Sequence, residues 1–371
     1  MNYYNPFAKA PGARAPTARA HPPERTEPDL NITMVGMGAI GGLMGARLAS
    51  AGGHVSALAR GATLAALQAR GMDVQHADGS PGISGVPIHA VSDANASALG
   101  PQDLVVIAVK ATQLPAVAAS ITPLIGPSTL VMTAMNGVPW WFFGPGTGDR
   151  AGLTLPSLDP DGALARVVPI ERTLGCVVHL SAACPQPGAV RLNFGNRLLV
   201  GPAIPAQAGL AAAARPLMEA LTAGGFDAAW SDGIRRDIWY KLWGNMTINP
   251  ISVLTGATAD RILDDPLLHR FCLSAMAEAS AIGALIGCPI VQTGAERMAV
   301  TRELGAFKTS MLLDAEIGKA LEIDALITVV HDIGLAVGVA TPAIDILLGL
   351  IRLHGRCHGL YPESAVASTA A

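Results

Sequence analysis

Three polar side chains at regular spacing could act together on a small substrate. Lys241, Asn245 and Asn249 follow one another at intervals of four residues. In an α-helix, with about 100° per residue, they fall on one face within roughly 80°. One ammonium and two amides suit an oxygen-rich ligand, although a solvated helix surface would show the same spacing. Pro250 predicts that the helix ends or kinks there, which would turn Asn249 into a cleft.

A glycine motif about 200 residues upstream favours the ligand-binding interpretation. It comprises Gly36, Met37, Gly38, Ala39, Ile40 and Gly41. The first glycine suits a tight turn, the second lets the backbone approach a pyrophosphate, and the third allows close packing of helix and strand. The motif lies between a predicted strand and a predicted helix, whose N-terminus would bind the phosphates. This context predicts dinucleotide binding rather than a glycine-rich turn without a ligand.

The end of the second predicted strand indicates which dinucleotide is bound. Many NAD-binding proteins have an acidic residue there, which bonds the ribose 2′-hydroxyl, but this chain has Arg60. A guanidinium pairs well with a 2′-phosphate, so the sequence favours NADP(H) over NAD(H). The alternative is that Arg60 is simply solvated.

Two further residues follow predicted strands at the sheet edge where open α/β folds bind ligands. Lys110 comes after the apolar run 103–109, and Asn136 comes after the run 129–134. Both are candidates for contact with cofactor or substrate. The alternatives are a charged strand terminus for Lys110 and an ordinary Asn-Gly turn for Asn136.

The first half of the chain alternates predicted strands and helices, which is typical of a Rossmann-type doubly wound sheet. Residues 141–170 are rich in glycine and proline and predict an inserted loop. Beyond it, residues 176–180 and 190–194 predict a hairpin that finishes the sheet. The other predicted elements are strands at 32–36, 54–60, 103–109 and 129–134, and a helix at 40–51.

The second half of the chain predicts an all-helical domain. Its apolar patterns predict helices at 234–249, 262–287, 294–304, 315–337 and 342–354. The expected division is a disordered tail at 1–30, a dinucleotide-binding domain at 31–232, a helical substrate domain at 233–358 and a C-terminal tail at 359–371. Long apolar helices permit a homodimer.

Composition points toward a small-molecule enzyme in the cytoplasm. The chain has 371 residues, of which 50% are hydrophobic and 14% charged, and its net charge of −3 comes without a basic stripe. These properties argue against nucleic-acid binding, and acidic residues interrupt every long apolar run, which argues against a membrane span. Five scattered cysteines predict reduced thiols. The His354, Cys357 and His358 spacing lacks further ligands, so no metal site is expected.

Taken together, these motifs resemble the ketopantoate reductase (2-dehydropantoate 2-reductase) family from about Ile32 to about Arg352. The resemblance extends to a serine and a glutamate twelve residues apart, Ser310 and Glu322. The motifs that carry it are 36–42, 109–111, 135–138, 241–250, 310–311 and 322–324. The implied activity is NADPH-dependent reduction of a 2-oxo acid, 2-dehydropantoate, to pantoate.

The resemblance also implies a role for each candidate residue. Lys241 would donate a proton to the developing alkoxide, and Asn136 would hold that lysine in place. Glu322 would accept a hydrogen bond from a substrate hydroxyl, although a solvated helix carboxylate is the alternative. Lys110 would lie near the nicotinamide ribose. Substrate-binding roles are implied for Asn245, Asn249 and Ser310, of which Ser310 could instead cap a helix.

Departures from the family pattern leave the substrate open. Phe307 occupies a position where the pantoate-forming enzymes have asparagine. Residues 139–143 add two tryptophans and two phenylalanines, which either line a larger pocket or pack the insertion onto the sheet. Asp314 and Asp324 are interpreted as surface or structural charges, although Asp314, four residues after Ser310, could approach the cleft. The competing functions are a related 2-oxo acid reductase or 2-hydroxy acid dehydrogenase with another substrate, and a non-catalytic NADP-binding sensor.

Overall fold

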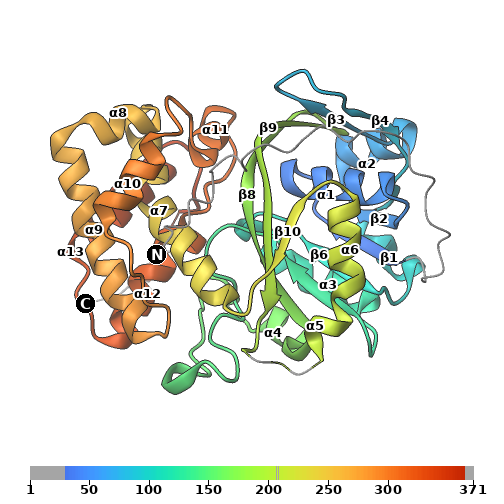
Figure 1. Ribbon diagram of the computed structural model, residues 1–371, viewed down its shortest axis with the longest axis horizontal. Helices are drawn as coiled ribbons and strands as arrows, with labels where there is room; N and C mark the ends of the chain where they lie inside the picture. Colours follow the sequence, from blue (N-terminus) through green and yellow to red (C-terminus); the bar gives the residue numbers. More distant parts are fainter. Residues whose placement is uncertain (1–29, 206, 208, 364–371) are drawn as a thin grey trace, which may run out of the picture.

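The computed structural model describes residues 30–363 except 206 and 208, and along the chain a region that contains the sheet precedes a helical region (Figure 1). Strands alternate with helices up to Trp230, and among the described residues only helices and loops follow from Ile234 onward. This arrangement confirms the predicted fold class. The predicted N-terminal tail lies outside the described residues except for Leu30. Within the predicted C-terminal tail, Leu360 is buried and its carbonyl accepts a hydrogen bond from Leu321 N at 2.9 Å.

The described residues form one ten-stranded sheet in the order β4-β3-β9-β8-β7-β6-β1-β2-β5, with β10 also paired to β9. Neighbouring strands from β7 to β5 are parallel, whereas β8 and β9 form an antiparallel hairpin. The strands are β1 (Asn31–Val35), β2 (His54–Leu58), β3 (Met72–His76), β4 (Ile83–Val86), β5 (His89–Val91), β6 (Leu104–Ile107), β7 (Leu130–Thr133), β8 (Thr173–Gln186), β9 (Ala189–Pro202) and β10 (Asp227–Trp230).

The central strands are buried on both faces, as their continuous apolar runs predict. Along β6, Leu104 and Val106 join the core on one face of the sheet, while Val105 and Ile107 join the core on the other. This alternation follows from the two-residue period of a strand. The second of these cores continues into the helical region, so the helices pack directly against the sheet.

The predicted hairpin exists, but it does not finish the sheet. β9 is long enough to pair with β3 through residues 189–192 and with β10 through residues 197–200. The hairpin therefore lies inside the sheet, and β3 and β4 extend the sheet beyond it. The sequence prediction missed this because β3 is a short strand with a mixed polar pattern.

The helices of the second half cover most of the predicted ranges, with different breaks. The predicted helix 262–287 is divided at Asp265, whose side chain caps a new helix that has Pro266 in its first turn. The helices of the molecule are α1 (Ala39–Ser50), α2 (Gly61–Arg70), α3 (Val117–Ile121), α4 (Ala163–Val167), α5 (Leu210–Ala213), α6 (Arg215–Ala223), α7 (Ile234–Thr255), α8 (Ala259–Asp264), α9 (Pro266–Leu285), α10 (Gly294–Arg302), α11 (Ser310–Glu316), α12 (Val329–Val337) and α13 (Pro342–Cys357).

The sequence predicted that the helix ends or kinks at Pro250, and the structure excludes an end there for α7. This helix continues through the proline to Thr255 and stops at Gly256, which has a left-handed backbone with φ of +69°. Proline removes a single hydrogen bond from the helix, and this segment is buried on all sides, so packing outweighs the loss. Asn249 reaches the cleft because of its place on the helix face.

The predicted helix 315–337 is interrupted. α11 ends at Glu316, and Gly318 has φ of +69°. The chain becomes helical again only after Glu322, through a π-helical turn, η6 (Asp324–Thr328), that leads into α12. The apolar period runs across this break, which is why periodicity alone did not reveal it. The break leaves Glu322 at the beginning of the second helical segment.

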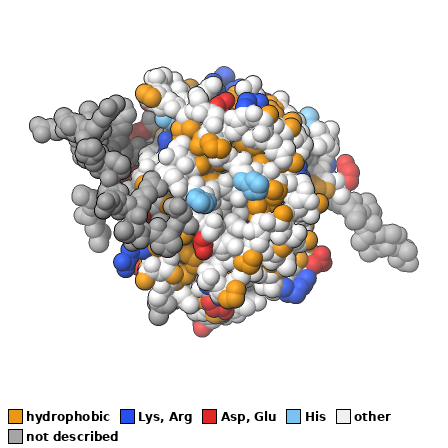
Figure 2. Space-filling view, turned by 90° about the vertical axis from the view of Figure 1, so that its right-hand side faces the viewer, with side chains coloured by type: hydrophobic (Ala, Val, Ile, Leu, Met, Phe, Trp, Pro, Cys, Tyr) orange, Lys and Arg blue, Asp and Glu red, His pale blue; other side chains and the backbone are white. Residues whose placement is uncertain are grey.

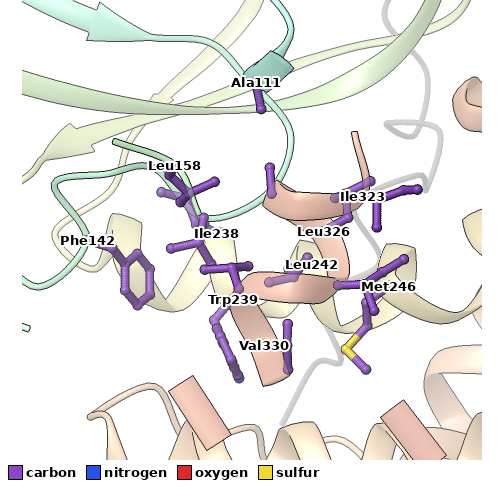
Figure 3. Packing of buried hydrophobic residues seen from close by; sticks show 14 of the residues in the cluster. Ala111, Phe142, Leu158, Ile238, Trp239, Leu242, Met246, Ile323, Leu326 and Val330 are labelled. Carbon is purple, nitrogen blue, oxygen red and sulfur yellow. The ribbon is translucent and has the colours of Figure 1, made fainter. Parts of the chain in front are cut away.

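The insertion at 141–170 packs as part of the core. It contains α4, and residues 140–143 are between 0% and 8% exposed. Figure 3 shows Phe142 and Leu158 of this region beside Ile238 and Trp239 of α7. Of the two alternatives for residues 139–143, packing of the insertion is therefore confirmed.

Charged side chains are sparse on the face shown in Figure 2, where the described Lys and Arg groups are scattered and lie mostly toward the margins. Among the helices of the described residues, none is long and apolar enough to cross a membrane. The five cysteines are free thiols.

Candidate active site

A cleft with a volume of about 1100 Å³ separates the carboxyl ends of the central strands from the helical region. Its lining combines the glycine motif after β1, the residues that follow β6 and β7, one face of α7 and the segment around α11. The predicted site residues that line it are Gly36, Met37, Gly38, Ala39, Ile40, Arg60, Lys110, Asn136, Lys241, Asn245, Asn249, Ser310 and Glu322.

The glycine motif forms the turn between β1 and α1. Gly36 has φ of +96°, a conformation that favours glycine. A Cβ at Gly41 would lie 1.9 Å from the Gly36 carbonyl oxygen, so this glycine permits the tight turn. A Cβ at Gly38 would meet nothing within 4 Å, because the residue borders open cleft. Gly41 itself packs behind the turn and does not line the cleft.

Lys241 is held by two acceptors at the base of the cleft. Its Nζ donates to Asn136 Oδ1 at 2.8 Å and to the Val178 carbonyl at 2.7 Å. An ammonium has three donors, so one N–H remains for a ligand. Burial lowers the pKa of Lys241 to about 8. The predicted contact between Lys241 and Asn136 is thus present.

Glu322 faces the same part of the cleft. One of its carboxylate oxygens, Oε1, accepts a hydrogen bond from the backbone N–H of Ala111 at 3.0 Å. Burial raises the pKa of Glu322, although that hydrogen bond and the charges of Lys110 and Lys241 oppose the shift. The other oxygen, Oε2, accepts no hydrogen bond from the described residues and is available to a ligand hydroxyl.

Lys110 pairs with Asp314 across the cleft. Lys110 follows β6, and Asp314 lies in α11. The Asp314 side chain is only 18% exposed. Asp314 also lines the cleft, which its position four residues after Ser310 had allowed. Asp324, by contrast, accepts bonds from Thr328 and Tyr361 hydroxyls and is structural.

Arg60 lies at the far end of the cleft, next to the glycine motif. It forms an ion pair with Asp93, a residue that the sequence reasoning did not single out. The Arg60 side chain is 61% exposed, so it is accessible from solvent. A ligand phosphate placed there would compete with Asp93 for the guanidinium.

The amide and hydroxyl candidates lie on the helical side of the cleft. Asn249 is 5% exposed, and Asn245 is partly exposed one turn earlier. The side chain that caps α11 belongs to Thr309, which accepts from Leu312 N at 3.1 Å, so Ser310 is not the cap and is exposed in the cleft. Phe307 lines the cleft as well and packs against the core.

Two residues that line the cleft, His179 and Arg297, belong to no motif that the sequence analysis recognised. His179 is buried beside Lys241, and desolvation together with neighbouring positive charges lowers its pKa to about 3. Its imidazole is therefore neutral near pH 7 and is a poor proton donor. Arg297 is also buried in the cleft wall, 56 residues after Lys241 in the chain. Only the tertiary structure brings it next to α7.

Comparison with known proteins gives the same relatives for both halves of the chain. The family model "Ketopantoate reductase PanE/ApbA" matches residues 32–204, and the model of its C-terminal domain matches residues 233–355. A 2-dehydropantoate 2-reductase of Mesorhizobium japonicum is 39% identical over 324 residues, covering 87% of this chain and 97% of the relative. One of Mycobacterium tuberculosis is 28% identical over 326 residues, covering 86% and 96%.

Solved structures agree with these matches. A protein from Ralstonia solanacearum MolK2, provisionally named ketopantoate reductase, is 54% identical with a TM-score of 0.83, covering 90% of this chain and 99% of that one. D-mandelate dehydrogenase with NADH and anilino(oxo)acetate has a TM-score of 0.73 at 21% identity, covering 89% and 99%, and shares the fold. The chain thus belongs to the ketopantoate reductase PanE/ApbA family of oxidoreductases, which use a nicotinamide cofactor and act on small 2-oxo acids.

Proposed function

We propose that this protein reduces a 2-oxo acid with NADPH, with 2-dehydropantoate as substrate, pantoate as product and Lys241 as the general acid. The carrying observation is the placement of Lys241. Its Nζ is fixed by Asn136 and Val178, faces a cleft shared with the glycine motif, and has a pKa of about 8. A proton donor is most effective when its pKa lies near the working pH.

The residues of the cleft suit the chemistry of carbonyl reduction. When bound, the nicotinamide supplies a hydride to the carbonyl carbon, and the electron pair of the C=O bond moves onto oxygen. The Lys241 ammonium stabilises that developing charge and transfers one proton to the oxygen, which yields the hydroxyl. Asn136 keeps the lysine oriented throughout. Solvent then restores the proton on the neutral amine.

The cofactor end of the cleft fits a phosphorylated dinucleotide. The empty space beside Gly38 and the N-terminus of α1 suit a pyrophosphate, whose negative charge the helix dipole favours. Arg60 is accessible and can exchange its Asp93 partner for a 2′-phosphate. These features support NADP(H) over NAD(H).

The two domains divide these tasks. Residues 31–232 bind the cofactor, and residues 233–358 supply the acid and most of the substrate contacts. On the substrate side, the remaining oxygen of Glu322 accepts from a substrate hydroxyl, and Ser310, Asn245 and Asn249 serve its carboxylate and hydroxyl groups. All of these line the cleft.

A related 2-oxo acid reductase with another substrate is the second candidate. Phe307 in the cleft wall favours it, because an aromatic side chain cannot replace the hydrogen bonds of an asparagine. A non-catalytic NADP sensor is the third. Burial of the Lys241 ammonium costs free energy and lowers its pKa. A protein that only senses NADP gains nothing from that cost, whereas a proton donor does.

The test is stopped-flow oxidation of NADPH with a panel of 2-oxo acids, including 2-dehydropantoate. Turnover of 2-dehydropantoate with the highest kcat/KM is expected. Turnover restricted to other acids would replace the substrate, and no turnover with any acid would favour the sensor.

The proton-donor role is tested with Lys241→Met and Lys241→Arg. Both are expected to lower kcat by about 10²–10⁴-fold, since general acid catalysis contributes about that much. Arginine keeps the charge but does not release its proton, so it separates proton transfer from charge stabilisation. NADPH affinity, measured by fluorescence titration, is expected to stay within about threefold. Activity retained in the methionine variant would place the acid elsewhere.

The apolar outer face of α13 supports a homodimer. Ile346, Leu350 and Leu353 are 59%, 52% and 60% exposed, and their spacing puts them on one side of the helix. We propose that a second copy of this chain covers this face. One solved relative, from Staphylococcus aureus, is described as dimeric.

A further inference from the structure

Arg297 is a buried guanidinium in the wall of the active-site cleft. It lies in α10, is 5% exposed and lines the cleft. Its Nη1 donates to Thr301 Oγ1 at 2.9 Å, and its Cζ lies 5.4 Å from the centroid of the Tyr240 ring. Its Nε is buried without a hydrogen-bond partner.

No acidic side chain neutralises this charge. Among residues 30–363 apart from 206 and 208, no Asp or Glu oxygen lies within 4.0 Å of the Arg297 guanidinium. A buried charge normally has a counter-ion, because desolvation of an unpaired ion is strongly unfavourable. Arginine does not relieve that cost by losing its proton. The position therefore suits an anionic group that arrives with a ligand.

The guanidinium lies beside the turn of α7 that carries the proposed acid. A Cβ at Gly244 would lie 2.9 Å from Arg297 Nη2, so the glycine leaves the space that the guanidinium occupies. Gly244 stands between Lys241 and Asn245, both of which line the cleft. The charge of Arg297 also reaches His179, which follows the residue whose carbonyl holds Lys241.

We propose that Arg297 binds the carboxylate of the 2-oxo acid substrate and makes the enzyme selective for anionic substrates. This inference rests on the proposed reductase function. The carboxylate of a 2-oxo acid is bonded to the carbonyl carbon, so its anchor has to lie near the proton donor. A guanidinium binds a carboxylate through two parallel hydrogen bonds, which also orients the carbonyl toward Lys241. Leu304 and Phe307 then contact the apolar remainder of the acid.

The experiment compares a 2-oxo acid with its methyl ester, which lacks the charge. In Arg297→Gln, KM for the acid is expected to rise about 10- to 100-fold, the loss of roughly 1.5–3 kcal/mol typical of a hydrogen bond to a charged group. The kcat/KM for the ester should change less than about threefold, and NADPH affinity should not change. Arg297→Lys keeps the positive charge but lacks the two parallel N–H donors of the guanidinium. Its KM for the acid should therefore lie between those of wild type and Arg297→Gln.

Arg302→Gln is the matched control. Arg302 lies on the same helix, but its side chain is 46% exposed and pairs with Asp264 on the surface. Its loss should leave both substrates unaffected. Equal losses for acid and ester in Arg297→Gln would assign Arg297 a structural role and overturn the proposal. The lysine variant provides the same comparison if the glutamine variant does not fold.

Binding of oxamate separates failure of this inference from failure of the proposed function. Calorimetric titration of oxamate into the NADP-loaded protein requires no turnover. Binding by wild type that is lost in Arg297→Gln would support the carboxylate site even in a protein that reduces no 2-oxo acid. Equal binding by both proteins, or binding by neither, would overturn it.

Discussion

Burial moves the pKa of Lys241 and the pKa of Glu322 in opposite directions. The pKa of the lysine falls and that of the glutamate rises, because each loses hydration of its charged form. Each charge also favours the charged form of the other. For Lys241 the result is a pKa of about 8, which is closer to neutral pH than that of an exposed lysine.

The pKa of Lys241 predicts opposite pH profiles for the two directions of the reaction. Reduction requires the ammonium, so its kcat/KM should fall as pH rises through about 8. Oxidation of the hydroxy acid requires the neutral amine, so its kcat/KM should rise through the same pH. Steady-state rates from pH 6 to 10.5 measure both limbs. A descending limb near the unperturbed value of lysine, about 10.4, would show that burial does not tune this group.

Arg60 provides the test of cofactor choice. Arg60→Ala removes the cation proposed to bind the 2′-phosphate and should weaken NADPH by about 10- to 100-fold, as expected for a charge-assisted bond. NADH lacks that phosphate, so the affinity for NADH should fall less than about threefold. Fluorescence titration with both cofactors measures the difference. Equal losses would remove the 2′-phosphate role.

Asp93 supplies a counter-variant to that experiment. In the structure, the Asp93 carboxylate already forms an ion pair with the Arg60 guanidinium. Asp93→Asn frees the guanidinium and removes a negative charge from the proposed phosphate position. Asp93→Asn should therefore raise the affinity for NADPH a few-fold, whereas Arg60→Ala lowers it. Weaker NADPH binding in Asp93→Asn would mean that Asp93 instead orients the arginine.

At the scale of elements, Gly38 in the turn between β1 and α1 and Gly41 in the first turn of α1 are glycines for different physical reasons. Gly38→Ala adds a methyl group into open cleft and should leave the melting temperature within about 2 °C while weakening NADPH at least tenfold. Gly41→Ala brings a methyl group 1.9 Å from the Gly36 carbonyl and should destabilise the fold. The expected cost is about 1–3 kcal/mol, as for overpacking.

Thermal unfolding and NADPH titration of both alanine variants check this distinction. Destabilisation of Gly38→Ala similar to that of Gly41→Ala would show that the space beside Gly38 belongs to the fold and not to a ligand.

The elements that sequence analysis located well are those with uniform patterns. The strands that became β1, β6 and β7 are short apolar runs between turn signals, and α7 carries its polar residues at helical spacing. Helix interruptions were harder to predict. The hydrophobic period continues on both sides of Asp265 and of Gly318, so it does not mark either break. Strand order also escaped prediction because the pairing of β3 with β9 depends on long-range contacts.

The site was predictable where motifs carry it. The contact between Lys241 and Asn136 joins two motif residues and was expected from the sequence. Arg297 was not, since nothing in its neighbours along the chain distinguishes it from an ordinary helix charge. For Asp314, the spacing from Ser310 only allowed an approach to the cleft. Their roles arise from which elements α10 and α11 pack against.

At the scale of the whole molecule, the cleft exists because one core joins sheet and helices. Buried residues of β6, the insertion, α7 and η6 form a continuous cluster on one side of the sheet. Figure 3 shows Leu242 and Met246 of α7 near Leu326 and Val330. This packing holds Lys241, which lies in α7, against the carboxyl ends of the central strands.

The exposed face of α13 leads to the prediction at this scale. Leu350→Glu places a charge at the centre of the Ile346, Leu350 and Leu353 face and should convert a dimer into a monomer, because an interface core excludes unpaired charges. Size-exclusion chromatography with light scattering at about 10 µM measures the mass. Val291→Glu is the control, since Val291 is 93% exposed in the loop between α9 and α10 and does not belong to this face. A wild-type monomer, or a Leu350→Glu dimer, would contradict the assignment of α13 as the interface.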